Sequence, residues 1–292
     1  MQPPKSKIVA PQTVARKTPV ITDWSDIASW YDQLVGEGGS EYHQRVVLPG
    51  VLRLLKVEQG QRVLDAACGQ GVLARLLAMR DVRVTAFDSS KALIDSARVH
   101  NDGLEPSKIR HAEYMVLDAT KPFGQFLPQN TFDSAACVLA IQNIHPIQPL
   151  CEGVAGALKP GGRFVIAMMH PCFRGPKETF WGWDATDKVQ YRRVDRYLLP
   201  RKAPIVAHPG MKESHYTWSF HKPIESYVKC LRNAGLLIDA IEEWPSHKTS
   251  QPGARQAAEN QSRKEIPMFM AIRAIKVGDV NYQPEPEEPQ PD

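Results

Sequence analysis

The segment from Arg62 to Ala74 constrains the fold more than any other part of the sequence. It begins with apolar residues that suit a buried strand, including Val63 and Leu64, and continues through a glycine-rich turn into an apolar helical pattern. Gly69 and Gly71 lack a Cβ, so the backbone of this turn can adopt left-handed angles and can approach a ligand closely. The helix that follows directs unpaired N–H groups and the positive end of its dipole toward the turn. The segment therefore predicts a strand–turn–helix unit that binds a nucleotide-like ligand.

Two classes of cofactor fit this turn. The spacing Gly69-x-Gly71-x-x-Ala74 matches the loose fingerprint of dinucleotide-binding enzymes. Asp65 stands four residues before the first glycine, where a carboxylate would repel a pyrophosphate but would attract the ammonium and sulfonium groups of S-adenosylmethionine. The segment resembles the first motif of the class I S-adenosylmethionine-dependent methyltransferases, V-L-D-x-x-C-G-x-G. A nicotinamide enzyme and a glycine turn without a ligand remain the alternatives.

A second acid follows the next strand-like segment. Residues 82–87 alternate in polarity and are rich in β-branched side chains, and Asp88, Ser89 and Ser90 follow before a new helical pattern begins. A carboxylate at the tip of a second strand can accept both hydroxyls of a ribose, in S-adenosylmethionine sites as in NAD sites. Asp88 and Ser89 are therefore candidate cofactor residues, and capping of the following helix is the alternative role.

A third acid, Asp118, ends the strand predicted over residues 111–117. The resemblance implies that Asp118 accepts a hydrogen bond from the adenine amino group and that the backbone N–H of Ala119 reaches a ring nitrogen. A fourth strand is predicted over residues 131–139, and its last residue, Leu139, is expected at the same edge, where open α/β sheets bind ligands. Because a dinucleotide site does not require a third strand-end acid, the three acids together favour S-adenosylmethionine as the cofactor.

The order of the predicted elements gives the fold class. Strands alternate with helices through residue 169, and a helix and two strands follow within residues 223–275, which predicts an α/β, doubly wound and mostly parallel sheet. The resemblance covers residues 24–276 and implies a seven-stranded, Rossmann-like sheet whose last strand is antiparallel. The expected organisation is a disordered basic tail at 1–22, a methyltransferase domain at 23–277 with a helical cap at 23–58 and an insertion at 170–222, and a disordered acidic, proline-rich tail at 278–292.

The helical cap contains the segment Trp30-Tyr31-Asp32, which in the resembling family lies over the cofactor. Tyr31 is a candidate cofactor contact, and packing in the core is the alternative, which we favour for Trp30. Apolar spacing predicts one helix over residues 24–35. A second helical region should break near Pro49, because proline removes a backbone donor.

The insertion concentrates aromatic and basic side chains. Residues 170–222 hold nine of the 23 aromatic residues, and the stretch between His170 and His221 holds nine Lys or Arg against five Asp or Glu. Such a segment predicts a lid or pocket that selects a planar or aromatic acceptor with an anionic group. The alternatives are a subdomain whose aromatic residues form its own core, and surface ion pairs that select nothing.

Two histidines are candidate catalytic residues. His145 and His170 follow the fourth and fifth predicted strands, at the edge where the cofactor is expected. If the acceptor is a hydroxyl, histidine is the natural base for it near neutral pH. For each of them, a structural role is the alternative. No cluster of residues with the spacing of a metal site is visible, and we expect no metal.

Composition limits the partners. The formal net charge is +4, and the five cysteines form no C-x-x-C pair, which is typical of a cytoplasmic protein. No apolar run approaches the roughly 18 residues that a membrane helix needs, so no membrane partner is expected. Four basic residues in the N-terminal tail without interleaved aromatics do not favour nucleic acid. The leading hypothesis is methyl transfer to an oxygen or nitrogen of a small molecule, and the alternatives are an RNA methyltransferase, an NAD-dependent oxidoreductase and a non-catalytic binding protein.

Overall fold

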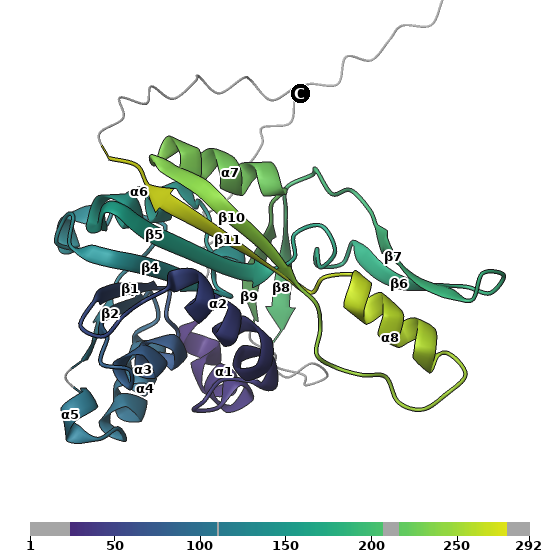
Figure 1. Cartoon of the computed structure of the whole chain (residues 1–292), viewed down its shortest axis with the longest axis horizontal. Coiled ribbons are helices and arrows are strands. Elements are labelled where there is room, and N and C mark those ends of the chain that lie inside the picture. Colours follow the sequence, from purple (N-terminus) through teal and green to yellow (C-terminus); the bar gives the residue numbers. More distant parts are fainter. Residues whose placement is uncertain (1–23, 110, 207–215, 279–292) are drawn as a thin grey trace, which may run out of the picture.

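The computed structural model describes residues 24–109, 111–206 and 216–278, and a seven-stranded sheet lies at its centre (Figure 1). In spatial order the strands are β10 (Leu236–Trp244), β11 (Phe269–Lys276), β5 (Leu158–Met169), β4 (Phe132–Val138), β1 (Arg62–Ala66), β2 (Arg83–Asp88) and β3 (Ala112–Val116). The strands from β5 to β3 pair in parallel, and β11 runs antiparallel to both of its neighbours. The predicted mostly parallel sheet with an antiparallel last strand is confirmed.

Helices cover both faces of the sheet. The helical elements are η1 (Ser25–Ile27), α1 (Ala28–Val35), η2 (His43–Val47), α2 (Leu48–Leu55), α3 (Val72–Ala78), α4 (Lys91–Asp102), α5 (Pro106–Ile109), η3 (Gly124–Phe126), η4 (Ile141–Asn143), α6 (Gln148–Ala157), α7 (Ile224–Asn233) and α8 (Gln256–Glu265). On one face α6 and α7 bury Leu150 and Leu231, and on the other face α2 and α3 bury Val51 and Leu77. Figure 1 shows α6 and α7 above the sheet and α2, α3 and α4 below it. These two layers hold the strand tips in fixed positions.

The N-terminal cap differs from its prediction at one proline. The cap consists of η1, α1, the π-helical turn η2 and α2, which begins directly after η2. Pro49 does not break this region, so the predicted break is wrong. It lies at the second position of α2, directly after the π-helical turn, and the helix continues through it.

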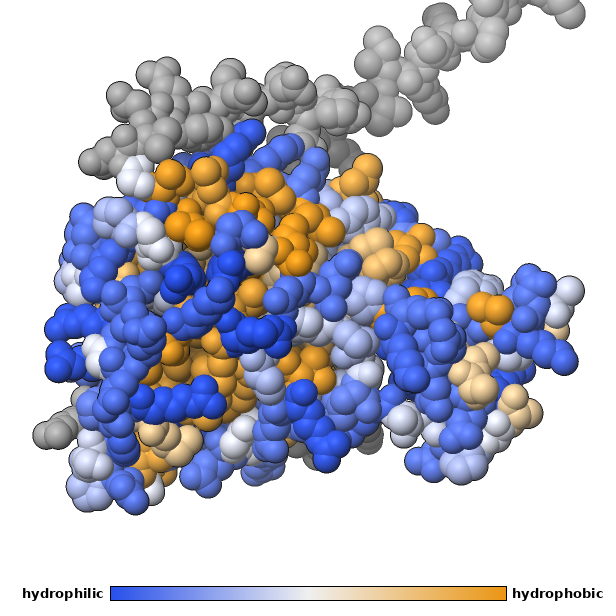
Figure 2. All heavy atoms as spheres, viewed as in Figure 1, coloured by the Kyte–Doolittle hydropathy of each residue, from blue (hydrophilic) through white to orange (hydrophobic). Residues whose placement is uncertain are grey.

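The insertion folds into two antiparallel β-hairpins, which explains why its sequence shows no helical period. The first joins β6 (Thr179–Asp184) to β7 (Val189–Val194), and the second joins β8 (Arg201–Val206) to β9 (Tyr216–His221). The first hairpin packs against α8, which the sequence analysis did not predict, and the Ser262 hydroxyl donates to the carbonyl of Gln190 at 2.7 Å. We call the β6–β7 hairpin and α8 together the arm. The arm extends away from the sheet in Figure 1, and its surface is mostly hydrophilic in Figure 2.

The two predicted tails lie outside the described residues, apart from Gly278. Residues 207–215 of the insertion also lie outside them. Within the part of the chain that the structure describes, no helix combines the length and the apolar character needed to cross a bilayer.

Candidate cofactor and acceptor site

A cavity of about 820 Å³ opens at the carboxyl ends of the parallel strands. It lies between the tips of β1, β2 and β4 and the helices of the cap, which is where open α/β sheets bind ligands. The predicted site residues that line it are Tyr31, Asp65, Gly69, Asp88, Ser89, Asp118, Ala119, Leu139 and His145. Two predicted site residues, Gly71 and His170, do not line it. Nine of the eleven predicted site residues therefore lie in the wall of one cavity.

Asp65, at the end of β1, is a buried carboxylate in need of a partner. Its side chain is 2% exposed, and Oδ2 has no hydrogen-bond partner among the described residues. Burial, followed by the charge of Asp88, raises the pKa of Asp65 to about 7, although a backbone hydrogen bond from Ala74 opposes the shift. An uncompensated buried charge is costly. A ligand that brings an ammonium group to this oxygen would remove that cost.

Asp88, at the end of β2, holds the glycine turn. Its Oδ2 accepts the backbone N–H of Gly69 at 3.0 Å, and its Oδ1 accepts the backbone N–H of Ser90 at 2.9 Å. Burial raises the pKa of Asp88 even though these bonds lower it in part. The N-cap of α4 is Ser90, whose hydroxyl accepts the N–H of Leu93 at 3.3 Å. Because Ser90 caps the helix, the carboxylate of Asp88 remains available to a ligand.

The two glycines of the turn have different surroundings. Gly69 has a φ of +55°, and a Cβ there would meet only the Tyr31 ring, at 3.6 Å. Gly71 has a φ of +79°, and a Cβ there would meet the Tyr114 side chain at 2.8 and 2.9 Å. The space beside Gly71 is therefore filled by protein. Gly69 faces the cavity, whereas Gly71 does not line it.

Asp118, after β3, is already held in an accepting orientation. Its Oδ1 accepts both the backbone N–H and the hydroxyl of Thr120, at 2.9 and 2.7 Å, and its Oδ2 lies 3.0 Å from the Lys121 ammonium. Burial raises the pKa of Asp118, but the bonds from Thr120 and Lys121 outweigh it, so the pKa is lowered. Ala119 is buried beside it. An ionised acceptor thus lies at the rim of the cavity.

The helical cap closes the cavity from above the glycine turn. The Tyr31 ring packs edge to face against Trp24, with 5.2 Å between ring centroids. Burial raises the pKa of Tyr31 to about 12, and the charges of Asp88 and Cys68 add to the shift. The phenol therefore stays protonated and can donate a hydrogen bond. The predicted position of Tyr31 at the cofactor is consistent with this geometry.

A buried arginine joins the cap to the glycine turn. The Arg75 guanidinium donates to the carbonyls of Gln70 and Glu37, at 2.5 and 2.6 Å. The side-chain amide of Gln70 in turn donates to the carbonyl of Gly36 at 2.9 Å. Sequence reasoning missed this brace. The signal that could have found it was a single arginine within an otherwise apolar helix.

The two candidate histidines lie in different environments. His145 lines the cavity, and its ring lies 5.1 Å from the ring of Phe220. Burial lowers the pKa of His145, and the charge of Lys222 lowers it further. Since the pKa lies below its ordinary value near 6.5, the ring is neutral at pH 7 and can accept a proton.

His170 does not line the cavity, and its contacts favour the structural alternative over a catalytic role. It is 2% exposed, and its Nδ1 accepts the backbone N–H groups of Cys172 and Phe173, at 3.2 and 3.4 Å. Its Nε2 therefore carries the proton and donates to Glu243 at 2.7 Å. With both nitrogens engaged, this ring fixes the start of the insertion.

A third histidine at the cavity was not predicted as a site residue. His43, in η2, lines the cavity, and its Nδ1 lies 2.8 Å from the Ser40 hydroxyl. Burial lowers the pKa of His43 as well. Within the described ranges, no three side chains of the His, Cys, Asp or Glu type are grouped as a metal site.

Comparison with known proteins identifies the family. A family model described as a methyltransferase domain matches residues 63–162, which include all three strand-end acids. A solved structure of an S-adenosylmethionine-dependent methyltransferase from Mesorhizobium loti matches with a TM-score of 0.61 and 25% identity, and the match covers 82% of this chain and 100% of that one. The chain contains a class I S-adenosylmethionine-dependent methyltransferase domain.

The curated relatives that match this chain are themselves named as methyltransferases. A demethylmenaquinone methyltransferase from Tropheryma whipplei is 29% identical over 157 residues, which are 53% of this chain and 56% of the relative. A ubiquinone biosynthesis O-methyltransferase from Xylella fastidiosa is 32% identical over 116 residues, which are 38% of this chain and 43% of the relative. The methyltransferase thus spans about half the length of the curated relatives it matches. Its cofactor is S-adenosylmethionine, and the unpartnered carboxylate of Asp65 fits the ammonium group of that molecule.

Proposed function

We propose that this methyltransferase transfers a methyl group to an oxygen or nitrogen of a small-molecule acceptor, with an aromatic hydroxyl as the best-supported group. When bound, S-adenosylmethionine supplies the electrophilic methyl group on its sulfonium. The observation that carries the proposal is the single cavity in which three strand-end acids and a neutral histidine meet. The name of the Xylella fastidiosa relative refers to O-methylation in ubiquinone biosynthesis, which supports an oxygen acceptor on a ring.

The three acids divide the binding of the cofactor in this proposal. Asp65 accepts from the ammonium group, Asp88 accepts from the ribose hydroxyls, and Asp118 accepts from the adenine amino group beside the backbone of Ala119. Each role suits the geometry, because Asp65 has an unpartnered oxygen, whereas Asp88 and Asp118 are already oriented by hydrogen bonds from backbone N–H groups. Binding in a fixed orientation is the main contribution that a protein makes to an in-line displacement.

His145 provides the base when the acceptor is a hydroxyl. Its neutral ring accepts the hydroxyl proton as the oxygen attacks, which increases the nucleophilicity of the oxygen. The Phe220 ring packs against the imidazole, and burial together with the charge of Lys222 lowers the pKa of His145, so the ring is unprotonated at neutral pH. Lys222 is itself anchored, since its Nζ donates to the carbonyl of Ile144 at 2.9 Å.

Separate isothermal titrations with S-adenosylmethionine, S-adenosylhomocysteine and NAD test the cofactor side. Binding of the first two without NAD is expected, and binding of NAD alone would contradict the proposal. For the acceptor side, hydroxybenzoic acids and their methyl esters form matched pairs. Methylation of the ring hydroxyl should be detected by mass, and turnover should be faster for the free acids. Equal rates for acids and esters would remove the anionic group from the proposed acceptor.

A further inference from the structure

Two arginines of the insertion share one tryptophan at the base of the arm. The guanidinium carbons of Arg174 and Arg192 lie 5.2 and 5.1 Å from the centroid of the Trp181 ring. Arg174 follows β5, Arg192 lies on β7 and Trp181 lies on β6, so the three meet only because the hairpin folds back on the end of β5. Both arginines are half-buried. The ring offsets some of the repulsion between them, because a cation over an aromatic face is attracted to it.

A third arginine approaches from the helical side of the arm. Burial and the charges of Arg192 and Arg263 lower the pKa of Arg174 to about 10, although Tyr42 opposes the shift. Arg263 lies on α8, and its Nε donates to the Ser250 hydroxyl at 3.2 Å. The neighbouring Ser262 hydroxyl donates to the carbonyl of Gln190 on β7, two residues from Arg192, and the three arginines come from α8, β7 and the segment after β5. Like charges that lie close together repel one another, and an anion between them removes that repulsion.

The hydrogen bonds of these arginines go to neutral groups. Arg192 donates to the carbonyl of Phe173 at 2.8 Å and to the hydroxyl of Thr179 at 2.6 Å. The Nε of Arg174 is buried and has no hydrogen-bond partner within the described chain. None of the three arginines is within ion-pair distance of a carboxylate in that same part of the chain.

Neighbouring arginines show that the arm does form ordinary ion pairs. Arg193 lies 2.9 Å from Asp195, and Arg196 lies 3.7 Å from Glu178. These exposed pairs are the surface arrangement that would select nothing. The arginines around Trp181 depart from it.

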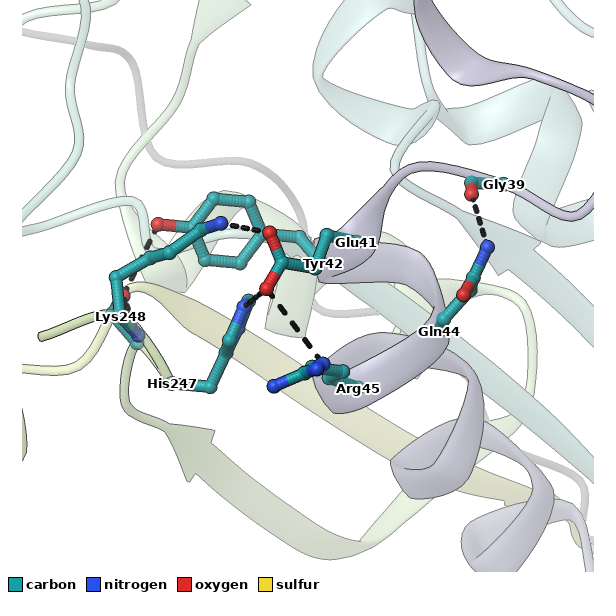
Figure 3. A network of polar contacts seen from close by, with 8 residues as sticks. Gly39, Glu41, Tyr42, Gln44, Arg45, His247 and Lys248 are labelled. Carbon is teal, nitrogen blue, oxygen red and sulfur yellow. Dashed lines mark hydrogen bonds and ion pairs between the residues drawn. The ribbon is translucent and has the colours of Figure 1, made fainter.

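Glu41, the residue before Tyr42, pairs with basic groups other than these three arginines. Figure 3 shows the Glu41 carboxylate in contact with Arg45, His247 and Lys248. His247 Nε2 lies 2.8 Å from Glu41, and the Tyr42 ring packs edge to face on the His247 ring at 4.8 Å. These contacts fix the segment that leads to α8 against the cap. The next residue, His43, lines the cofactor cavity.

We propose that Arg174, Arg192 and Arg263 form a binding site for an oxyanion, a phosphoryl or carboxylate group, at the anionic end of the methyl acceptor. The guanidinium fork donates parallel N–H bonds to either kind of oxyanion, and the unpartnered Nε of Arg174 is one such donor. The identification of this ligand as the methyl acceptor rests on the proposed function. The binding of an oxyanion at the three arginines does not depend on that function.

Titration with phenyl phosphate, benzoate and neutral phenol tests the site directly, without cofactor or turnover. Saturable binding of an anion and none of phenol is expected, and the tighter of the two anions identifies the preferred oxyanion. Arg174→Gln should weaken this binding about tenfold or more, because each lost charge-assisted bond is strong. Arg174→Lys, which keeps the charge and loses the fork, should fall between the two. Arg193→Gln, on the same hairpin but paired with Asp195, is the matched control and should bind like the parent.

Arg263→Gln provides a second variant if loss of Arg174 impairs folding, since Arg263 bonds to the Ser250 hydroxyl and lies on a helix that is mostly exposed or half-buried. Anion affinity that is the same in the parent, Arg174→Gln and Arg263→Gln would overturn the proposal. A lower melting temperature with unchanged anion binding would likewise assign the cluster to attachment of the arm. Failure to bind S-adenosylmethionine in the earlier titration would refute the proposed function and leave this result unaffected.

Discussion

The carboxylate of Asp88 accepts the backbone N–H of Gly69 at 3.0 Å, and this bond joins the tip of β2 to the turn after β1. The acid expected at the ribose and the glycine turn expected at the cofactor are therefore held together by this bond. Any change at Asp88 acts on both. This coupling determines how substitutions at the site should be chosen.

Asp88→Asn is expected to weaken S-adenosylmethionine binding by about 1–3 kcal/mol. The amide oxygen can still accept from Gly69, so the turn is preserved, but the amide NH2 cannot accept from Ser90 and the charge is lost. Isothermal titration gives the affinity, and urea unfolding checks the fold. Ser90→Ala is the control, because it removes the cap of α4 and should lower stability by about 0.5–2 kcal/mol with little change in affinity. Equal affinities in the parent and Asp88→Asn would restrict Asp88 to holding the turn.

The binding of S-adenosylmethionine should depend on pH through Asp65. The pKa of this carboxyl is about 7 without cofactor, and the ammonium group binds the ionised form. Below pH 7 the carboxyl must first release its proton, so affinity should fall up to about tenfold per pH unit and level off above about pH 8. Titration in buffers of different ionisation enthalpy should show proton release below pH 7. In Asp65→Asn the affinity should be weaker and this pH dependence should disappear.

The same carboxyl should also affect stability with the opposite sign. Its folded pKa is raised above the ordinary value of 3.8, so its contribution to the stability of the cofactor-free protein is fully present below about pH 4 and is lost as the pH rises through about 7. Asp65→Asn should therefore gain stability relative to the parent between pH 5 and pH 8. Thermal melts across that range measure the difference. A constant difference would show that the carboxyl titrates near its ordinary pKa.

Alanine at Gly69 and at Gly71 should separate binding from folding. Gly69→Ala places a methyl group toward the cavity with room inside the protein, so cofactor affinity should fall at least about tenfold while stability falls by only about 1–3 kcal/mol from the positive φ. Gly71→Ala must displace the Tyr114 ring and should cost more stability. Urea unfolding and cofactor titration on both variants decide the point. The reverse order of the two stability losses would refute the assignment.

The two histidines should respond differently to alanine. His145→Ala is expected to lower the rate with a hydroxyl acceptor by about 100-fold or more and to leave cofactor affinity unchanged. Because the pKa of His145 is lowered from 6.5, the rate of the parent should fall only as the pH drops below 6.5 and the ring becomes protonated. His170→Ala should mainly lower the melting temperature, because it removes the bonds to Glu243 and to the insertion. A large loss of rate in His170→Ala at unchanged stability would restore it as a catalytic candidate.

The sequence predicted the features that depend on residues close together in the chain. Strand, glycine turn and helix follow one another within Arg62 to Ala74, and the three acids each end a strand. Because the carboxyl ends of parallel strands meet at one edge, these acids could be expected in one cavity from the sequence alone. The helix break expected at Pro49 was wrong because the effect of a proline depends on where in the helix it lies.

Features that depend on contacts distant in sequence could not be predicted. Arg75 reaches Glu37, 38 residues earlier, and His170 reaches Glu243, 73 residues later. Neither side chain carries a local signal of its partner. In the insertion, alternation of exposed and half-buried residues marks strands only weakly, since neither face of the β6–β7 hairpin is fully buried. The cluster around Trp181 needs both the hairpin and α8, and α8 has too few apolar residues for a clear helical pattern.

The arm leaves and rejoins the sheet at adjacent strand ends. Its hairpin departs from β5, while α8 lies between β10 and β11, and the backbone N–H of His170 donates to the carbonyl of Met268 at 2.9 Å where the two departures meet. The strands that carry Asp65, Asp88 and Asp118 take no part in this junction. Insertions and deletions in the arm would leave the register of those strands unchanged. If the arm binds the acceptor as proposed, evolution can change the acceptor by altering the arm alone while the cofactor site stays as it is.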